Sequence, residues 1–329
     1  WIWEKKSFSY GNKMVSTGAI DGELEYYSAY PMTPASSILT EIINSKRIKY
    51  LQAEDEVAVI NSALWASFTW SRAMVWTSWG WFALMTEALS FAVQAEFPIT
   101  VALSMRAWPS TWTPTFFEQW DLNFALNPTF WDFDHVVLYP SSIEECYEFW
   151  ALALNIADKF QTVVILLLDK QLSELFATYE NLVLPKVDRW IFLDNPPDDY
   201  RRYEITESWV SPRVKVWTIS WDFIATSYEH DEFGATSEDP NMKVMMTEKR
   251  WRKLSNFYKE INHTGFEVIN KNAKKMLITT SANSYNLKAF VENNPEFWLI
   301  ILKIIKPLNP ELLEVINCLE ELIFVESNY

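Results

Sequence analysis

A basic side chain follows an apolar, strand-prone segment near the middle of the chain. Residues 97–103 read FPITVAL, and the sequence then changes abruptly in residues 104–122, SMRAWPSTWTPTFFEQWDL. This change predicts a loop at the carboxyl end of a strand, which is where open α/β sheets bind ligands. The planar guanidinium of Arg106 suits a carboxylate ligand. The alternative is a surface arginine in a proline-stiffened turn, because loops of this composition are common.

Two other stretches carry side chains that could take part in chemistry. Residues 30–34 read Tyr-Pro-Met-Thr-Pro, which alone indicates a proline-rich turn. Residues 52–56 read Gln-Ala-Glu-Asp-Glu and lead into a predicted helix with small apolar residues. Three acids at a helix start would ordinarily complement the helix dipole. The residue types alone therefore leave both stretches open to a structural role.

Composition argues against several classes of partner. The chain has 43 acidic and 28 basic residues and a formal net charge of −15, which argues against nucleic acid or an anionic membrane. The longest apolar runs, 162–168 and 297–305, are far shorter than the about 20 residues of a membrane-spanning helix. No secretory or transit segment is recognised at the start. We therefore expect a cytoplasmic protein.

Cysteine is scarce in the chain. The chain has 2 cysteines, too few for a disulfide framework or for the thiolates of an iron–sulfur cluster. Any cluster must therefore lie on another chain. The consecutive residues His230, Asp231 and Glu232 are not expected to bind a metal, because adjacent residues in one turn rarely converge on one ion. HExxH and CxxC motifs do not occur.

Glycine is scarce and tryptophan is abundant. The chain has 6 glycines and 18 tryptophans, whereas average usage predicts roughly 23 glycines in a chain of this length. The glycine deficit is close to the tryptophan excess. Tryptophan cannot replace glycine where the backbone needs a positive φ or a close approach to a ligand.

Strand and helix patterns alternate along most of the chain, which predicts an α/β fold with a mostly parallel sheet and helices on both faces. We expect a linker at 1–11, a first α/β domain at 12–187, an irregular excursion at 188–270, and a smaller, apparently truncated α/β domain at 271–329. Strands are expected at 49–52, 73–78, 136–139, 162–168, 276–280, 297–305 and 322–326, and helices at 12–25, 38–44, 54–69, 82–96, 285–291 and 311–319.

Taken together, the motifs resemble those of the α subunit of 2-oxoacid:ferredoxin oxidoreductases. The loop at 106–122 resembles the family pattern R-x-G-P-S-T-G-x-P-T…Q-x-D-L, and residues 30–34 resemble Y-P-I-T-P. Residues 77–85, TSWGWFALM, are similar to T-S-G-P-G-F-S-L-M. The resemblance extends from Gly11 to Tyr329, and further matching segments are 211–213, 228–234 and 326–329.

This resemblance implies the pyrimidine-binding domain of thiamine diphosphate enzymes, followed by a transketolase C-terminal-like domain. The implied reaction is the coenzyme A-dependent oxidative decarboxylation of 2-oxoglutarate or a broad range of 2-oxoacids. The products would be an acyl-CoA, carbon dioxide and electrons for ferredoxin. A β subunit would share the thiamine diphosphate and supply Mg2+ and at least one 4Fe–4S cluster. A γ domain or subunit is a further partner that the family allows.

The resemblance also implies roles for individual residues. Arg106 would bind the substrate carboxylate, and Thr33 and Thr111 would orient the 2-oxoacid. Glu56 would hydrogen-bond the aminopyrimidine ring and so activate the cofactor, with Glu54 as the alternative. The remaining expected contacts are Tyr30, Pro31 and Ser110 with substrate, and Thr77 and Ser78 with cofactor.

The sequence departs from the family mainly at glycine positions. Trp79, Trp81, Trp108 and Trp112 stand where the family has glycine, and residues 130–132, Phe-Trp-Asp, lack the histidine of the family's H-G-D/E. Either the written sequence is wrong at these tryptophan positions, or the protein has lost the site and is an inactive scaffold. Another thiamine diphosphate enzyme, such as a transketolase-like carboligase, is the other alternative.

Overall fold

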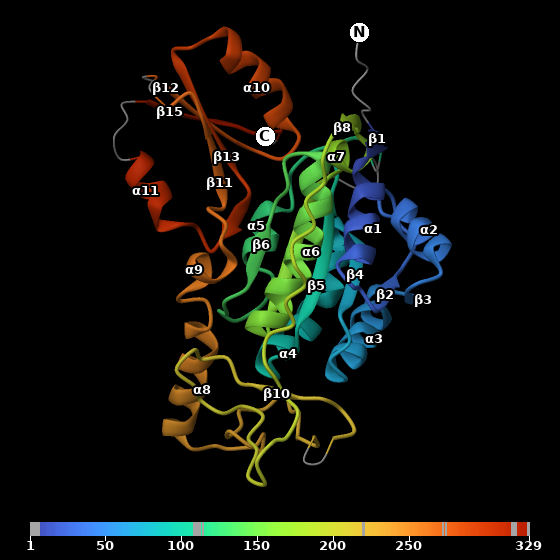
Figure 1. Ribbon diagram of the computed structural model, residues 1–329, viewed down its shortest axis with the longest axis vertical. Coiled ribbons are helices and arrows are strands. Elements are labelled where there is room, and N and C mark those ends of the chain that lie inside the picture. Colours follow the sequence, from blue (N-terminus) through green and yellow to red (C-terminus); the bar gives the residue numbers. More distant parts are fainter. Residues whose placement is uncertain are drawn as a thin grey trace.

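The computed structural model describes residues 7–107, 113, 115–218, 221–271, 273, 275–316 and 321–327. A larger unit is built on a seven-stranded sheet of order β14-β6-β7-β5-β4-β2-β3, and a smaller one on a four-stranded sheet of order β11-β13-β12-β15 (Figure 1). A long, mostly irregular segment joins them. The predicted α/β fold with a mostly parallel sheet is confirmed.

The central strands of the large sheet are buried on both faces. Every residue of β4 (Ala73–Ser78), β5 (Ile99–Met105) and β7 (Val163–Asp169) is buried. Parallel strands covered on both faces need apolar residues at every position, which explains why these segments show continuous apolar runs. The other strands of this sheet are β2 (Tyr26–Ala29), β3 (Lys49–Gln52), β6 (Val136–Leu138) and β14 (Ile304–Lys306).

Helices cover both faces of this sheet, and each face has its own core. In β4 the side chains of Met74 and Trp76 enter one core, whereas Val75 enters the other, as the alternation of side chains along a strand requires. The first core includes residues of α1 (Gly11–Asp21), α2 (Ser36–Ser45) and α6 (Ile143–Phe160). The second includes residues of α3 (Glu56–Phe68), the 3-10 helix η1 (Trp79–Met85), α4 (Thr86–Gln94) and α5 (Leu122–Leu126).

The smaller unit shares a strand segment with the large sheet. The predicted strand 297–305 is divided into β13 (Phe297–Leu302), in the small sheet, and β14, which pairs antiparallel with β6. Lys303 marks the crossing, and its ammonium lies 2.8 Å from a carboxylate oxygen of Glu267. The other elements of this unit are β11 (Phe266–Ile269), β12 (Lys275–Thr280), α10 (Asn283–Asn293), α11 (Pro310–Ile316) and β15 (Glu321–Val325).

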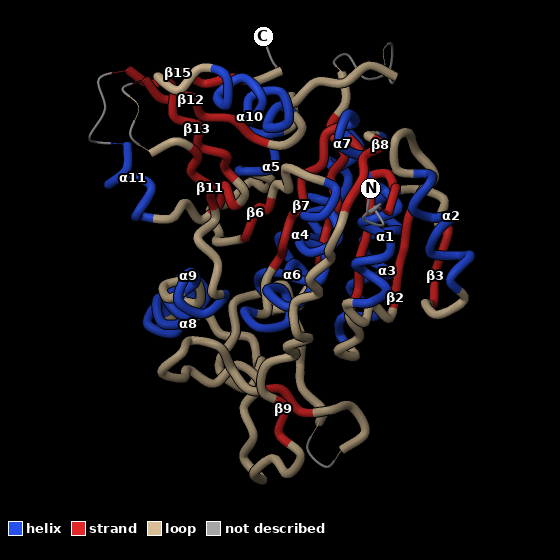
Figure 2. The backbone as a smooth tube through the Cα atoms, turned by 45° about the horizontal axis from the view of Figure 1, so that its top comes forward, coloured by secondary structure: helices blue, strands red, loops and turns tan. Residues whose placement is uncertain are grey.

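Part of the predicted N-terminal linker is a strand. Residues Ser7–Tyr10 form β1, which pairs antiparallel with β8 (Phe176–Tyr179). The partner strand lies far along the sequence, so local residue patterns do not reveal the pairing. Together with α7 (Lys170–Glu174), this ribbon lies at the end of the large sheet that faces the smaller unit (Figure 2).

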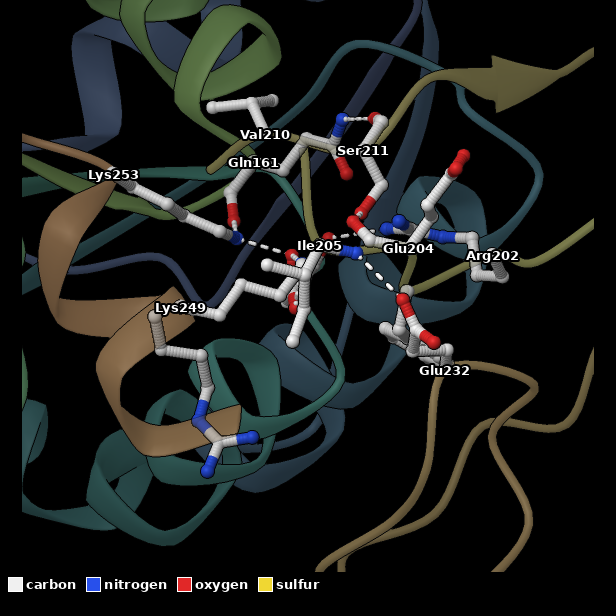
Figure 3. A network of polar contacts seen from close by, with 12 residues as sticks. Gln161, Arg202, Glu204, Ile205, Val210, Ser211, Glu232, Lys249 and Lys253 are labelled. Carbon is white, nitrogen blue, oxygen red and sulfur yellow. Dashed lines mark hydrogen bonds and ion pairs between the residues drawn. The ribbon is translucent and has the colours of Figure 1, made fainter. Parts of the chain in front are cut away.

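The irregular excursion lies at the opposite end of the large sheet (Figures 1 and 2). It is fixed there by a buried charge cluster around Glu96, just after α4. Figure 3 labels three members of this cluster, Arg202, Lys249 and Lys253. The ammonium groups of Lys249 and Lys253 lie 2.6 and 2.5 Å from the Glu96 carboxylate, and Arg202 donates a hydrogen bond to its carbonyl at 2.9 Å. The excursion contains β9 (Phe192–Leu193), β10 (Arg213–Val214), α8 (Pro240–Arg252) and α9 (Phe257–Ile261).

The charge cluster yields a stability prediction. Burial opposes ionisation of Glu96, but the two ammonium groups outweigh it and hold the pKa of its carboxyl well below the usual value. Glu96→Ala leaves Lys249 and Lys253 buried without this partner, so it should lower the free energy of unfolding by about 3–5 kcal/mol. Urea denaturation measures the loss. Glu238→Ala, at an exposed position, should change it by less than about 0.5 kcal/mol, and equal effects would contradict the prediction.

Candidate functional site

Four segments that carry predicted site residues meet at one edge of the large sheet. Strands β3, β2, β4 and β5 are neighbours and run parallel, so their carboxyl ends lie at the same edge. The segments that follow or end these strands are 53–56, 30–34, 77–78 and 106 onward. Open α/β sheets bind ligands at such an edge.

Arg106 lies directly after β5 and is held against the predicted substrate motif. Its Nη1 donates a hydrogen bond of 2.7 Å to the backbone carbonyl of Thr33. The residue is only 6% exposed, and its buried Nε has no hydrogen-bond partner among the described residues. Burial lowers the pKa of Arg106 and Asp121 counteracts this, but a guanidinium remains charged. A fixed, partly unsatisfied cation therefore lies at this edge.

The rest of the 30–34 motif borders an open groove. Tyr30, Pro31 and Thr33 are exposed. Thr33 lines a groove of about 500 Å³ whose wall also includes Ser37 of α2. The structure thus brings Thr33 and Arg106 together and leaves Tyr30 and Pro31 at the surface beside them.

The loop after Arg106 is closed at its base by a backbone hydrogen bond, in which Ala107 donates to the carbonyl of Phe116 at 3.0 Å. The predicted substrate residues Ser110 and Thr111 lie outside the described residues. So do Trp108 and Trp112.

The three acids before α3 have different environments. Asp55 is the N-cap, and its Oδ1 accepts a hydrogen bond from the backbone N–H of Ala58 at 2.7 Å. Glu54 is exposed. Glu56 is only 1% exposed, and its buried Oε1 has no hydrogen-bond partner among the described residues. Burial raises the pKa of Glu56, and Asp55 adds to the effect.

An unpartnered buried carboxyl oxygen is costly, and the nitrogen of a bound ring could satisfy it. Glu56 therefore fits the role of a contact to the aminopyrimidine ring of thiamine diphosphate, whereas the exposed Glu54 does not.

The two hydroxyl residues at the end of β4 differ in their hydrogen-bond partners. Thr77 is buried, and its Oγ1 lacks a hydrogen-bond partner among the residues described. Ser78 Oγ donates a hydrogen bond of 2.8 Å to the carbonyl of Ser104 in β5. Thr77 is thus available to a ligand, while Ser78 links two strands.

Two buried polar residues near Arg106 had no role in the expectations from sequence. Asp121 is 5% exposed with an unpartnered Oδ2, and burial raises its pKa to about 7 although Arg106 lowers it. Gln119 donates to the hydroxyl of Tyr139 at 2.8 Å and accepts from the backbone N–H of Ser327 at 3.0 Å. Gln119 therefore connects the site edge to the smaller unit. The Q-x-D-L spacing was the signal in the sequence.

A further cavity of the described residues lies elsewhere. It has a volume of about 720 Å³ and is lined by Phe91, Glu229 and Arg250, among others, but by no predicted site residue. Within the described ranges, no group of three potential metal ligands occurs, and His230 instead approaches the carbonyl of Tyr228 at 3.2 Å. No described helix is both long and apolar enough to cross a membrane.

Comparisons with known proteins identify the family of this chain. A family model described as pyruvate flavodoxin/ferredoxin oxidoreductase, thiamine diphosphate-binding, matches residues 17–250. The alpha subunit of 2-oxoacid:ferredoxin oxidoreductase 2 from Aeropyrum pernix is 40% identical over 265 residues, which are 74% of this chain and 41% of that relative. The alpha subunit of oxidoreductase 1 from Sulfurisphaera tokodaii is 34% identical over 342 residues, covering 97% of this chain and 54% of that relative.

A solved structure is similar over nearly the whole chain. The 2-oxoglutarate:ferredoxin oxidoreductase of Magnetococcus marinus, with 2-oxoglutarate, coenzyme A and succinyl-CoA bound, superposes with a TM-score of 0.90 at 28% identity. The match covers 99% of this chain and 59% of that one. The chain spans about half the length of the curated relatives named above.

Proposed function

This chain belongs to the thiamine diphosphate-binding family of pyruvate flavodoxin/ferredoxin oxidoreductases, and we propose that it is the α part of a 2-oxoacid:ferredoxin oxidoreductase. Its membership confirms the resemblance predicted from the motifs. The proposed reaction converts 2-oxoglutarate, or a broad range of 2-oxoacids, with coenzyme A into an acyl-CoA and carbon dioxide, and passes electrons to ferredoxin. The observation that carries the proposal is the buried Arg106, fixed by the Thr33 carbonyl at the sheet edge that also holds Glu56.

Each of these residues has a separate task in the proposed site. Arg106 binds the substrate carboxylate, and the Thr33 carbonyl orients the guanidinium for it. Glu56 bonds the aminopyrimidine ring of the cofactor through its unpartnered oxygen, and Thr77 offers a second buried contact. Bound thiamine diphosphate would supply the stabilisation of the carbanion, while these side chains hold the 2-oxoacid in place.

A β subunit would complete the site from the side of β3. This edge strand is exposed at all four residues, and Leu51 on it and Val57, next to Glu56, are exposed apolar side chains. Exposed apolar patches mark protein interaction sites. The proposed β subunit binds the cofactor diphosphate and Mg2+ and carries the 4Fe–4S cluster. Ferredoxin, a γ domain or subunit, and a cytoplasmic location are further parts of the proposal.

This division of the site between two chains predicts that the isolated chain is inactive. It is assayed with thiamine diphosphate, magnesium, coenzyme A, 2-oxoglutarate and a viologen dye, with and without its β partner. We expect dye reduction only with both chains present, because the chain alone supplies only the pyrimidine side of the site. Dye reduction by the isolated chain would overturn the proposed division.

Two further readouts of the same assay separate the alternatives. Thiamine diphosphate binding by the complex is expected of an enzyme and not of an inactive scaffold. Turnover that needs neither dye nor ferredoxin would indicate a transketolase-like carboligase instead.

A further inference from the structure

Two buried, oppositely charged side chains flank the substrate loop. Arg106 begins the loop and Asp121 ends it, and a backbone hydrogen bond from Ala107 to the carbonyl of Phe116 links two residues between them. Both residues are more than nine-tenths buried, and each has one polar atom without a hydrogen-bond partner in the described part of the chain. Each of the two charges alters the ionisation of the other.

We propose that Asp121 is the counter-ion of Arg106 in the free site, and that it takes up a proton when a substrate carboxylate binds Arg106. This inference rests on the proposed function. A carboxylate ligand neutralises the guanidinium, so the attraction that keeps Asp121 ionised is lost. Two buried carboxylates beside one cation cannot both remain charged without a large cost in free energy. Asp121 is therefore a positioning residue that couples substrate binding to protonation.

The direction of the pH dependence follows from the free site. There the pKa of Asp121 is about 7, because burial raises it and Arg106 lowers it. Substrate binding removes the Arg106 charge and raises this pKa further. Binding should take up few protons at pH 6, about half a proton at pH 7 and more at pH 8. The dissociation constant should rise with pH above 7, by up to about tenfold per pH unit.

Other titratable groups near Asp121 do not produce this dependence. Among the described residues, Arg106 is the charged group that shifts the pKa of the Asp121 carboxyl. His135, which packs against α5, has its pKa lowered to about 4 by burial and by Lys306, so it stays neutral between pH 6 and 8. Asp169, at the end of β7, is bonded to Gln119 at 3.4 Å.

Calorimetric titration of the complex with its β subunit tests the inference. The ligand is 2-hydroxyglutarate, which keeps the carboxylates of 2-oxoglutarate but has no ketone to react with the cofactor. Titrations at pH 6, 7 and 8 in buffers of different ionisation enthalpy give the number of protons taken up. We expect uptake that increases with pH in the wild-type complex, its loss in Asp121→Asn, and no change in Asp199→Asn, at an exposed position.

The outcomes separate this inference from the proposed function. If the complex turns over 2-oxoglutarate but binds the ligand without proton uptake, or with equal uptake in Asp121→Asn, the role of Asp121 is wrong and the function stands. The wild-type pH series decides even if the variant does not fold. If the complex turns over no 2-oxoacid, both fail.

A separate observation concerns the tryptophans. Eleven non-glycine residues in the described part of the chain have a positive φ. Four of them are Trp70, Trp190, Trp209 and Trp217, at φ 62°, 59°, 63° and 69°. This conformation is an outlier for a bulky residue and easy for glycine. Trp217 is 85% exposed, so packing does not explain why tryptophan stands there.

We infer that the cell places glycine at these four positions and at Trp79, Trp81, Trp108 and Trp112, where the family has glycine. A codon that one genetic code reads as tryptophan and another reads as glycine would have this effect. The chain has 6 glycines where average usage predicts roughly 23, so eight further glycines would remove about half of the deficit.

Peptide sequencing of the protein from its natural source tests this directly. We expect glycine at all eight positions, and tryptophan at positions 70, 190, 209 and 217 would overturn the inference. As a second measurement on the chain as written, Trp217→Gly should raise the melting temperature by about 2 °C or more, because it removes strain at positive φ. The control is Trp65→Gly, at a surface position inside α3, which should lower the melting temperature. A lower melting temperature for Trp217→Gly would also count against the inference.

Discussion

Replacing Arg106 by alanine is expected to raise the KM for 2-oxoacids by about 30-fold or more and to leave the KM for coenzyme A nearly unchanged. Truncating one partner of a buried charge pair costs about 2–5 kcal/mol, since the other charge remains without its partner. Arg106 is buried, and Thr33 fixes its orientation, so little can replace it. Steady-state kinetics of the complex with its β subunit, varying each substrate in turn, measure the effect.

Two controls make the Arg106 prediction specific. Arg106→Lys keeps a positive charge but loses the planar fork, so it should restore only part of the affinity for 2-oxoacids. Arg47→Ala removes an exposed arginine outside the candidate site, so it should leave both KM values as in the wild type. An equal rise in KM for the 2-oxoacid and for coenzyme A would mean that the loop is structural or binds the thioester side.

Glu56→Gln should lower kcat by at least about 100-fold, the lower range for a positioned proton-transfer group. Glutamine keeps the shape of the side chain but cannot hold the proton that activates the pyrimidine ring.

The structure also predicts how Glu56→Gln affects the stability of the fold. Burial raises the pKa of Glu56, so the ionised carboxylate costs stability at neutral pH. The Gln variant without cofactor should therefore unfold no more easily than the wild type.

Glu54→Gln is the matched control for Glu56, since it makes the same change two residues away at an exposed position. It should leave turnover within a factor of about two, as expected for a surface substitution. If Glu54→Gln were the damaging change and Glu56→Gln were mild, the assignment would be wrong by two residues.

The fold was predictable where residue patterns are local. The runs in β4, β5 and β7 are continuous because these strands are buried on both faces, and a single sequence shows this directly. The pairing of β1 with β8 was not predictable, because it joins distant segments. The crossing between β13 and β14 was hidden for a different reason, since both parts of this run are apolar and belong to buried sheets.

The motifs predicted which segments would carry the candidate site, but not the contacts between them. The motifs located Arg106 and Thr33, but their contact uses a backbone carbonyl, and no residue type signals a carbonyl's position. The choice between Glu54 and Glu56 depended on burial, which only the folded chain decides. For the same reason the raised pKa of Asp121 could not be read from its sequence motif.

The most direct test of the central claim is an experimental structure of the complex with its β subunit, thiamine diphosphate and 2-oxoglutarate. We expect a substrate carboxylate within hydrogen-bonding distance of the Arg106 guanidinium, and Glu56 in contact with the aminopyrimidine ring. A 2-oxoglutarate bound elsewhere, for example in the 720 Å³ cavity beside Arg250, with Arg106 and Glu56 contacting neither ligand, would contradict it.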